Sequence, residues 1–202
     1  RPQGCNALLC FPDAYEVGMS HTGIRILYSL LNRRDDTFCD LAFAPWPDLE
    51  AALRHEGLPL FGLQTRRPAA QFDLIGFSLG YELAYTNVLT MLDLAGVPLR
   101  ADQRGDGDPL VLAGGACTMN PAVIGPFCDV VVPGDGEEVL AEIAATVAAA
   151  RARGQAREQM LAAVRGLAGV WYPETPGPVR ARVVADLDRI PPPAELVPVT
   201  EP

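Results

Sequence analysis

The sequence contains no lysine: all 16 of its basic residues are arginine, and 25 acidic residues bring the net charge to −9. This balance gives no general electrostatic attraction to a nucleic-acid backbone, so we expect no nucleic-acid partner. The missing lysine also excludes the phosphate-binding loop G-x-x-x-x-G-K-S/T. We attribute the all-arginine composition to the codon bias of a GC-rich genome rather than to function.

Long apolar runs and paired cysteines are missing as well. No run approaches the roughly 18 uncharged apolar residues of a membrane-spanning helix, and we find no signal segment, so we expect a cytoplasmic protein without a membrane partner. The cysteines, Cys5, Cys10, Cys39, Cys117 and Cys128, form no C-x-x-C pair. This scatter disfavours a metal or iron–sulfur site within these residues, and a disulfide framework too.

What is present is ample material for a core, because 49% of the 202 residues are hydrophobic. Apolar segments that suit buried strands alternate with segments that suit helices. We predict strands at residues 7–11, 39–44, 73–78, 109–115 and 129–133, with a minor strand at 60–63. Helices are predicted at residues 24–31, 49–55, 88–94, about 137–153 and 158–165. The alternation predicts an α/β, Rossmann-like (flavodoxin-like) domain, a five-stranded parallel sheet with helices on both faces.

Helix ends carry recognisable signals. Asp48 is predicted to cap the helix at residues 49–55, and Gly57 and Gly96 are predicted to end that helix and the next one.

The last third of the sequence has a different character. Residues 170–172 and 179–184 predict a small β hairpin, and prolines in 190–193 and 197–199 predict a stiff linker. We therefore divide the chain into a Rossmann-like domain at 1–154 and a segment at 155–202. Since the chain begins without methionine and ends on a linker, we expect a piece of a longer polypeptide with a further domain after it.

Four loops follow predicted strands, at residues 13–23, 78–82, 113–118 and 134–138. In a doubly wound sheet, ligands bind beyond the carboxyl ends of the strands. Each loop contains glycine, which lets the backbone approach a ligand closely. The first loop lacks G-x-G-x-x-G, so an independent nucleotide-binding enzyme is the weakest alternative.

The first loop contains Asp13-x-Tyr15-x-x-Gly18. This pattern resembles the D-x-H-x-x-G motif of cobalamin-binding domains of the methionine synthase and mutase type, with tyrosine in place of histidine. The motif's histidine coordinates cobalt in those domains, whereas a phenol is neutral near pH 7 and a poor ligand. The resemblance therefore implies that any cobalamin is bound without an imidazole at position 15. His21 is the nearby histidine and could approach the same corner as a ligand. The more ordinary role of a histidine before a helix is to cap the helix or to pack on the surface.

Two later loops extend this resemblance. Ser78 and Leu79 match the serine-containing second loop. The Ser-x-Leu form of that motif is not kept, because Gly80 follows Leu79. Gly114 and Gly115 match the glycine pair of the third loop, although such a pair often serves only a tight turn.

A closer resemblance is to the N-terminal domain of radical S-adenosylmethionine proteins described as cobalamin-binding. It covers residues 6 to about 140, and residues 186–192 resemble the connector that precedes the radical domain. The segments that carry it are 11–21, 43–48, 73–79, 81–82, 86–89, 114–115 and 134–137. The C-x-x-x-C-x-x-C motif that holds the 4Fe–4S cluster is absent from these residues. The resemblance thus implies a following radical barrel in the same polypeptide, which would hold the cluster and S-adenosylmethionine.

Further residues of these segments are candidate cofactor contacts. Tyr81 and Glu82 follow a strand, and core packing of Tyr81 is the alternative. Gly134, Gly136 and Glu137 open a helix, where a carboxylate is also stabilised by the helix dipole without any ligand.

The expected function is that of an accessory domain, with no catalytic residue of its own. In the first hypothesis it binds cobalamin without a histidine ligand, or derives from such a domain, and supports radical or methyl-transfer chemistry of the barrel. In the alternative it has lost the cofactor and serves as a substrate-docking or interdomain scaffold. Tyr15 favours the alternative, whereas the glycines at several strand ends favour the first.

Overall fold

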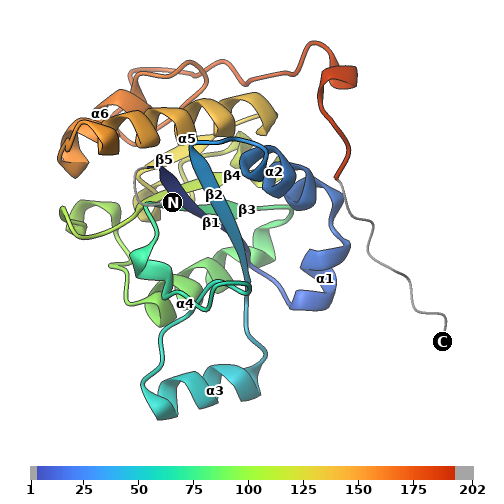
Figure 1. Cartoon of the computed structure of the whole chain (residues 1–202), viewed down its shortest axis with the longest axis vertical. Helices are drawn as coiled ribbons and strands as arrows, with labels where there is room; N and C mark the ends of the chain where they lie inside the picture. The colour runs from blue at the N-terminus through green and yellow to red at the C-terminus, as the bar shows by residue number, and fades with distance from the viewer. Residues whose placement is uncertain (1–3, 194–202) are drawn as a thin grey trace.

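The computed structural model describes residues 4–193 (Figure 1). Its centre is a five-stranded, all-parallel sheet in the order β2-β1-β3-β4-β5. The strands are β1 (Cys5–Phe11), β2 (Thr37–Phe43), β3 (Leu74–Ser78), β4 (Leu110–Gly114) and β5 (Val130–Val132). This order is that of flavodoxin-like folds, in which the winding reverses between β1 and β3. The predicted Rossmann-like fold is confirmed.

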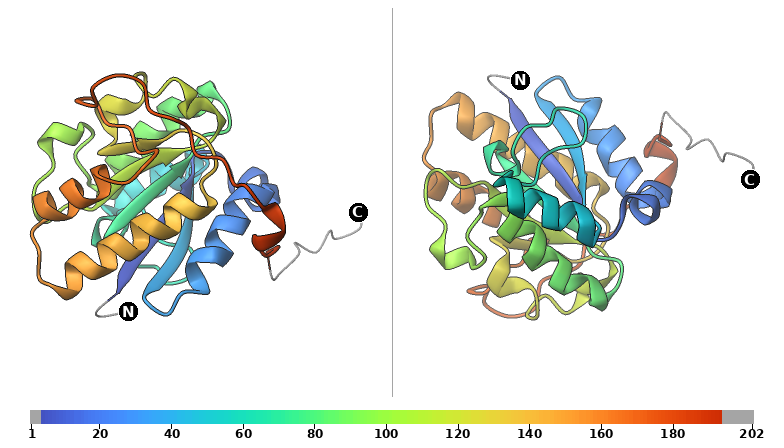
Figure 2. Two further views of the ribbon diagram at one scale, coloured as in Figure 1. Left: turned by 90° about the horizontal axis from the view of Figure 1, so that it is seen from above. Right: turned by 90° about the horizontal axis from the view of Figure 1, so that it is seen from below.

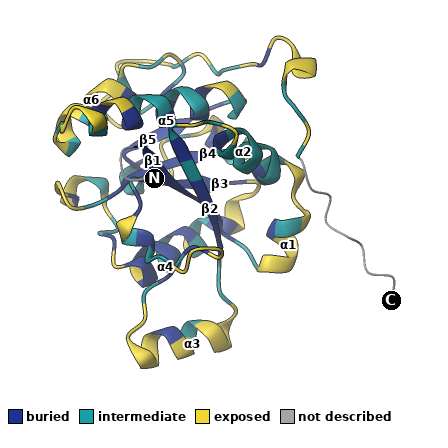
Figure 3. Ribbon diagram, viewed as in Figure 1, coloured by how far each residue is buried: buried dark blue, intermediate teal, exposed yellow. Residues whose placement is uncertain are grey.

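Helices cover both faces of the sheet (Figure 2). A hydrophobic core lies between each face and its helices. One face carries α2 (Thr22–Asn32), α5 (Glu137–Ala152) and α6 (Arg157–Arg165). The other carries α3 (Pro47–Glu56) and α4 (Tyr85–Ala95). The strands are buried almost throughout (Figure 3), because a parallel sheet covered on both sides needs apolar residues on both.

Helix α3 lies at the periphery of the fold (Figure 1) and buries one residue, Leu53. Gly57 and Gly96 end α3 and α4 in the left-handed conformation, as predicted. The prediction that Asp48 caps α3 is wrong. Trp46 is the N-cap and Pro47 the first helical residue, a position that suits proline because its missing N–H would have no partner there.

The first loop contains a short helix that the sequence did not predict, α1 (Tyr15–Ser20). The predicted hairpin takes another form. In the described part of the chain, residues 170–172 and 179–184 do not pair with each other. Trp171 instead makes an antiparallel bridge to Val131, and Arg182 makes a parallel bridge to Gly134. Strand β5 lies at the sheet edge, and its free backbone groups recruit Trp171.

Two other predicted segments are the minor strand and the proline-rich linker. The minor strand at 60–63 reduces to one bridge between Phe61 and Pro68. Residues 190–193 carry no regular secondary structure, and 197–199 lie outside the described residues.

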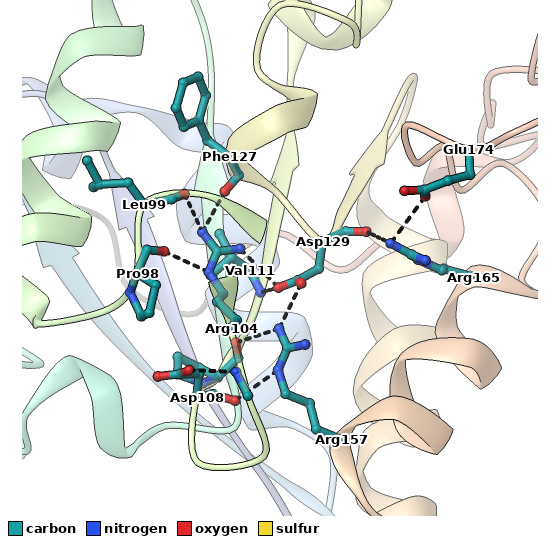
Figure 4. A network of polar contacts seen from close by, with 12 residues as sticks. Pro98, Leu99, Arg104, Asp108, Val111, Phe127, Asp129, Arg157, Arg165 and Glu174 are labelled. Carbon is teal, nitrogen blue, oxygen red and sulfur yellow. Dashed lines mark hydrogen bonds and ion pairs between the residues drawn. The ribbon is translucent and has the colours of Figure 1, made fainter. Parts of the chain in front are cut away.

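A buried ion cluster of Arg104, Asp129 and Arg157 joins α6 to the edge of the sheet where the strands begin (Figure 4). We call it the amino-edge cluster. Asp129 is 1% exposed and accepts hydrogen bonds from the Val111 N–H at 2.7 Å and from Arg104 at 3.1 Å. Its other oxygen pairs with Arg157 of α6 at 2.7 Å. Burial lowers the pKa of Arg104, and Asp129 opposes this shift. Arg104 also donates to the carbonyl groups of Pro98, Leu99 and Phe127.

Candidate functional site

A cavity of about 400 Å³ lies at the carboxyl edge of the sheet, between the strands and helices α2 and α5. We call it the carboxyl-edge pocket. Its walls are apolar side chains from both layers: Leu9, Leu112 and Val132 from the strands, Ile24 and Leu27 from α2, and Val139, Leu140 and Ile143 from α5. Parallel α/β folds bind ligands at this edge, and an apolar pocket with a few polar groups at its rim is typical of a ligand site.

Gly76, in the middle of β3, gives the pocket its flat floor. It pairs with Leu9 of β1 and Leu112 of β4. A Cβ added to Gly76 would lie 3.1 Å from Leu9 Cδ2 and 3.3 Å from Leu112 Cδ1, so a larger residue would push into the space that these leucines line. Gly76 was not among the predicted site residues, although a glycine inside a strand is itself a sign of close approach.

The predicted site residues fall into two groups. The residues lining the carboxyl-edge pocket are His21, Ser78, Gly114, Gly115, Gly134, Gly136 and Glu137. Those outside its lining are Asp13, Tyr15, Gly18, Leu79, Tyr81 and Glu82.

The glycine pair after β4 has a structural reason of its own. Gly115 has φ +106°, and a Cβ there would overlap the main chain of Leu79. The Leu79 N–H donates to the Gly114 carbonyl at 2.7 Å, and the Leu79 carbonyl accepts from the Cys117 N–H at 3.2 Å. Leu79 itself is fully buried in the core on the other face of the sheet. Its main chain therefore shapes the rim of the pocket, while its side chain is structural.

Asp13 and Tyr81 meet above the ends of β1 and β3. The Asp13 carboxylate accepts from the Ala14 N–H at 2.7 Å and from the Tyr81 hydroxyl. This hydrogen bond to Asp13 raises the pKa of Tyr81. Glu82 is exposed at the start of the following 3₁₀ turn. The pair ties two adjacent strand ends together at the topological switch point.

Helix α1 packs over β1 and β2. The Tyr15 ring meets the Phe43 ring edge-on, with centroids 5.3 Å apart, and is 48% exposed. Gly18 lies against the same ring, since a Cβ at Gly18 would overlap Phe43 and approach Phe11 to 3.1 Å. The motif positions 15 and 18 therefore serve this packing.

His21 caps the next helix. Its Nδ1 accepts from the Ile24 N–H at 3.4 Å, and its ring lies 5.0 Å from the Phe11 ring. These contacts are those of a helix cap and a packed ring, the ordinary roles considered for this histidine. The ring also lines the pocket. Among residues 4–193, no group of three or more histidine, cysteine or acidic side chains could hold a metal ion.

The loop after β5 forms the wall of the pocket nearest the C-terminal segment. Gly134 has φ +93°, and a Cβ there would overlap the main chain of Arg182. Gly136 has an ordinary helical backbone, and a Cβ there would make only normal contact with Leu27, at 3.5 Å. Glu137 begins α5, where the helix dipole favours its charge.

Residues 23–173 match the family described as radical SAM proteins, N-terminal. The chain belongs to this family. The resemblance to the N-terminal domain of radical SAM proteins is thereby confirmed, and an N-terminal domain of such proteins implies a further domain after it. Among curated proteins, none matches the sequence. In the described residues of the radical SAM N-terminal domain, no helix is both long and apolar enough to cross a membrane.

Solved structures of the radical S-adenosylmethionine methyltransferase TsrM from Kitasatospora setae are similar to this domain. One, with cobalamin and a 4Fe–4S cluster bound, is 16% identical, with a TM-score of 0.52 over 83% of this chain and 27% of that chain. Another, with tryptophan substrate and a S-adenosylmethionine analogue bound, is 15% identical, with a TM-score of 0.49 over 82% of this chain and 28% of that chain. At such identity the likeness concerns the fold, and the chain spans little more than a quarter of those proteins.

Proposed function

We propose that this radical SAM N-terminal domain binds cobalamin, with the heterocyclic base of the cofactor's nucleotide tail in the carboxyl-edge pocket. The observation that carries this proposal is the apolar pocket with a glycine floor at the topological switch point. Its volume of about 400 Å³ is near the lower end of the range for small-molecule sites, about 300–1,000 Å³. A flat heterocycle fits such a space, whereas a corrin ring with its amide side chains does not and would remain outside.

The residues that would hold the cofactor follow from the lining of the pocket. Leu9, Gly76 and Leu112 would pack against the base, and the Ser78 hydroxyl and the Gly114–Gly115 main chain would offer polar groups at the rim. We propose no cobalt ligand from this chain. Tyr15 packs on Phe43, and His21 caps α2.

In this proposal the domain carries no catalytic residue. Bound cobalamin supplies a cobalt centre that can carry a methyl group or exchange single electrons. The barrel that we expect after this domain would hold the 4Fe–4S cluster and S-adenosylmethionine and would generate the radical. The division near residue 154, between cofactor domain and connector, belongs to the same proposal. The apolar pocket excludes water from the base, and the rim orients the remainder of the cofactor.

The proposal is tested by titrating the full-length polypeptide with hydroxocobalamin and following the visible spectrum and co-elution. Gly136→Leu would place a side chain in the pocket without backbone strain, because Gly136 has φ −89°. Gly107→Leu is the matched control, since Gly107 also has an ordinary φ and open space around it, at the turn before β4. We expect the wild type and Gly107→Leu to bind alike and Gly136→Leu to bind at least tenfold more weakly. Wild-type protein that does not bind at high micromolar cofactor would refute the proposal.

A second function is favoured by a separate observation, the exposed apolar side chains near α1 and the start of α3. Trp46 is 59% exposed between two prolines, and Tyr15, Val17 and Leu49 are about half exposed. The Trp46 Nε1 lies 3.3 Å from a Glu16 carboxylate oxygen, which joins the two elements. Such a surface suits a scaffold that docks the following domain. This function would be favoured if the full-length protein binds no cobalamin and the Trp46→Ser variant loses the enzymatic activity of the following domain.

A further inference from the structure

The segment of residues 179–185, which we call the strap, runs along the wall of the carboxyl-edge pocket. The Arg182 N–H donates to the Pro133 carbonyl at 3.2 Å, and the Arg182 carbonyl accepts from the Asp135 N–H at 2.9 Å. The Val184 N–H donates to the Asp135 carboxylate at 2.8 Å. Gly134 and Asp135 also line the pocket. The strap thus pairs with the same residues that form the pocket wall.

The Arg182 side chain fixes the strap to helix α5 as well. Its guanidinium donates to Glu142 at 2.6 and 3.2 Å and lies 3.5 Å from Glu138. These carboxylates, and Glu142 above all, raise the pKa of Arg182. Glu138 and Glu142 stand one turn apart outside the pocket lining, whereas the adjacent Val139 and Ile143 line the pocket. One arginine therefore holds both the loop and the helix that make this wall.

Beyond the strap, the chain crosses from the side of α5 to that of α2 (Figure 2). It passes through a short 3₁₀ helix, Leu187–Arg189, to Pro192, whose carbonyl accepts from Arg33 at the end of α2 at 3.3 Å. Helices α2 and α5 are the two helical walls of the pocket. The C-terminal segment is thus attached to both walls on its way to the residues that follow.

We propose that Arg182 is a positioning residue for the carboxyl-edge pocket, so that latching of the strap and closure of the Gly134–Glu137 wall around a ligand are one and the same event. A ligand in the pocket would then stabilise the strap, and the latched strap would raise ligand affinity by the same factor. The coupling to cobalamin rests on the proposed function above. The fixing of the wall by Arg182 does not depend on which ligand binds.

The first test is hydrogen exchange, followed by mass spectrometry, on the full-length polypeptide without ligand. Arg182→Met keeps the aliphatic stem and removes the guanidinium. We expect it to speed exchange in residues 133–140 about fivefold, the low end of usual coupling strengths, because the Glu142 pair is partly exposed. Arg182→Lys should restore protection in part. Arg54→Met is the control, since it breaks an exposed pair with Glu50 and Asp93 on the other face of the sheet.

Exchange in residues 133–140 that is the same in Arg182→Met and Arg54→Met would overturn the positioning role. If Arg182→Met does not fold, Glu142→Gln takes its place as the test variant, because it weakens the same contact from outside the pocket. Exchange in residues 133–140 should again be faster than in Arg54→Met.

The second test adds hydroxocobalamin. The wild type should become protected in residues 179–185, and Arg182→Met should bind about fivefold more weakly than Arg54→Met. Equal affinity of the two variants would overturn the coupling. Wild-type protein that binds no cobalamin would overturn the proposed function and the coupling to cobalamin, while the ligand-free exchange still decides the positioning role of Arg182.

Discussion

Replacing Asp129 by alanine would leave the positive charges of the amino-edge cluster without their counter-ion. The Arg104 side chain is fully buried, and that of Arg157 is 9% exposed. Removing one partner of a buried ion pair costs about 3–5 kcal/mol, because the remaining charge is neither paired nor hydrated. The Val111 N–H also loses its acceptor, for which about 1–3 kcal/mol is usual. The two costs overlap, so we expect a total of about 4 kcal/mol.

This prediction is checked by urea unfolding of residues 1–202 at neutral pH. With a urea dependence of about 2 kcal/mol per M, the midpoint of Asp129→Ala should fall by about 2 M. Asp93→Ala removes the exposed partner of Arg54 and should change the free energy of unfolding by less than about 1 kcal/mol. If the two variants shift the midpoint equally, the cluster does not stabilise the fold as argued.

Three further predictions concern the first loop and the buried thiols. Gly18→Val should destabilise the fold by about 1–3 kcal/mol in thermal unfolding, because its side chain collides with Phe43, and an unchanged midpoint would contradict that packing. With the bound cofactor reduced to cob(II)alamin, the electron paramagnetic resonance spectrum of Tyr15→His should show no protein nitrogen ligand, and the appearance of one would refute the placement of this side chain. Burial raises the pKa of Cys5 and of Cys128 from 9.0 to about 12. The buried neutral thiols therefore contribute fully to the free energy of unfolding below about pH 9, and this contribution is lost as the pH rises towards 12. A free energy of unfolding in urea that stays constant from pH 8 to 11 would refute this.

Much of the fold could be predicted because its signals are local. Apolar runs mark strands that are buried on both faces, and Gly57 and Gly96 end their helices through their own backbone freedom. Helix α1 was missed because no side-chain cap marks its start and its stability comes from packing on Phe11 and Phe43. The predicted hairpin was wrong because the open edge of β5 competes for the same backbone groups, and Trp171 pairs there.

The position of the candidate site could be predicted, whereas the reasons for its glycines could not. Glycine-bearing loops after successive strands indicated the carboxyl edge, where the pocket lies. The backbone at Gly115 and Gly134, however, is required by the nearby main chains of Leu79 and Arg182. These contacts join residues far apart in the sequence, so no local pattern reveals them. Gly76 is different: it was not predicted as a site residue, but it could have been, because its place inside a predicted strand is visible in the sequence.

The central claim, that the carboxyl-edge pocket holds the nucleotide tail of cobalamin, is tested most directly by comparing two corrinoids. The full-length polypeptide would be titrated with hydroxocobalamin and with cobinamide, which lacks the nucleotide tail, under identical conditions with visible absorbance as the readout. If the pocket buries the base, cobalamin should bind at least tenfold more tightly, since burying a flat apolar group of this kind is worth more than about 1.4 kcal/mol. Equal affinity for the two corrinoids, or no binding of either, would contradict the claim.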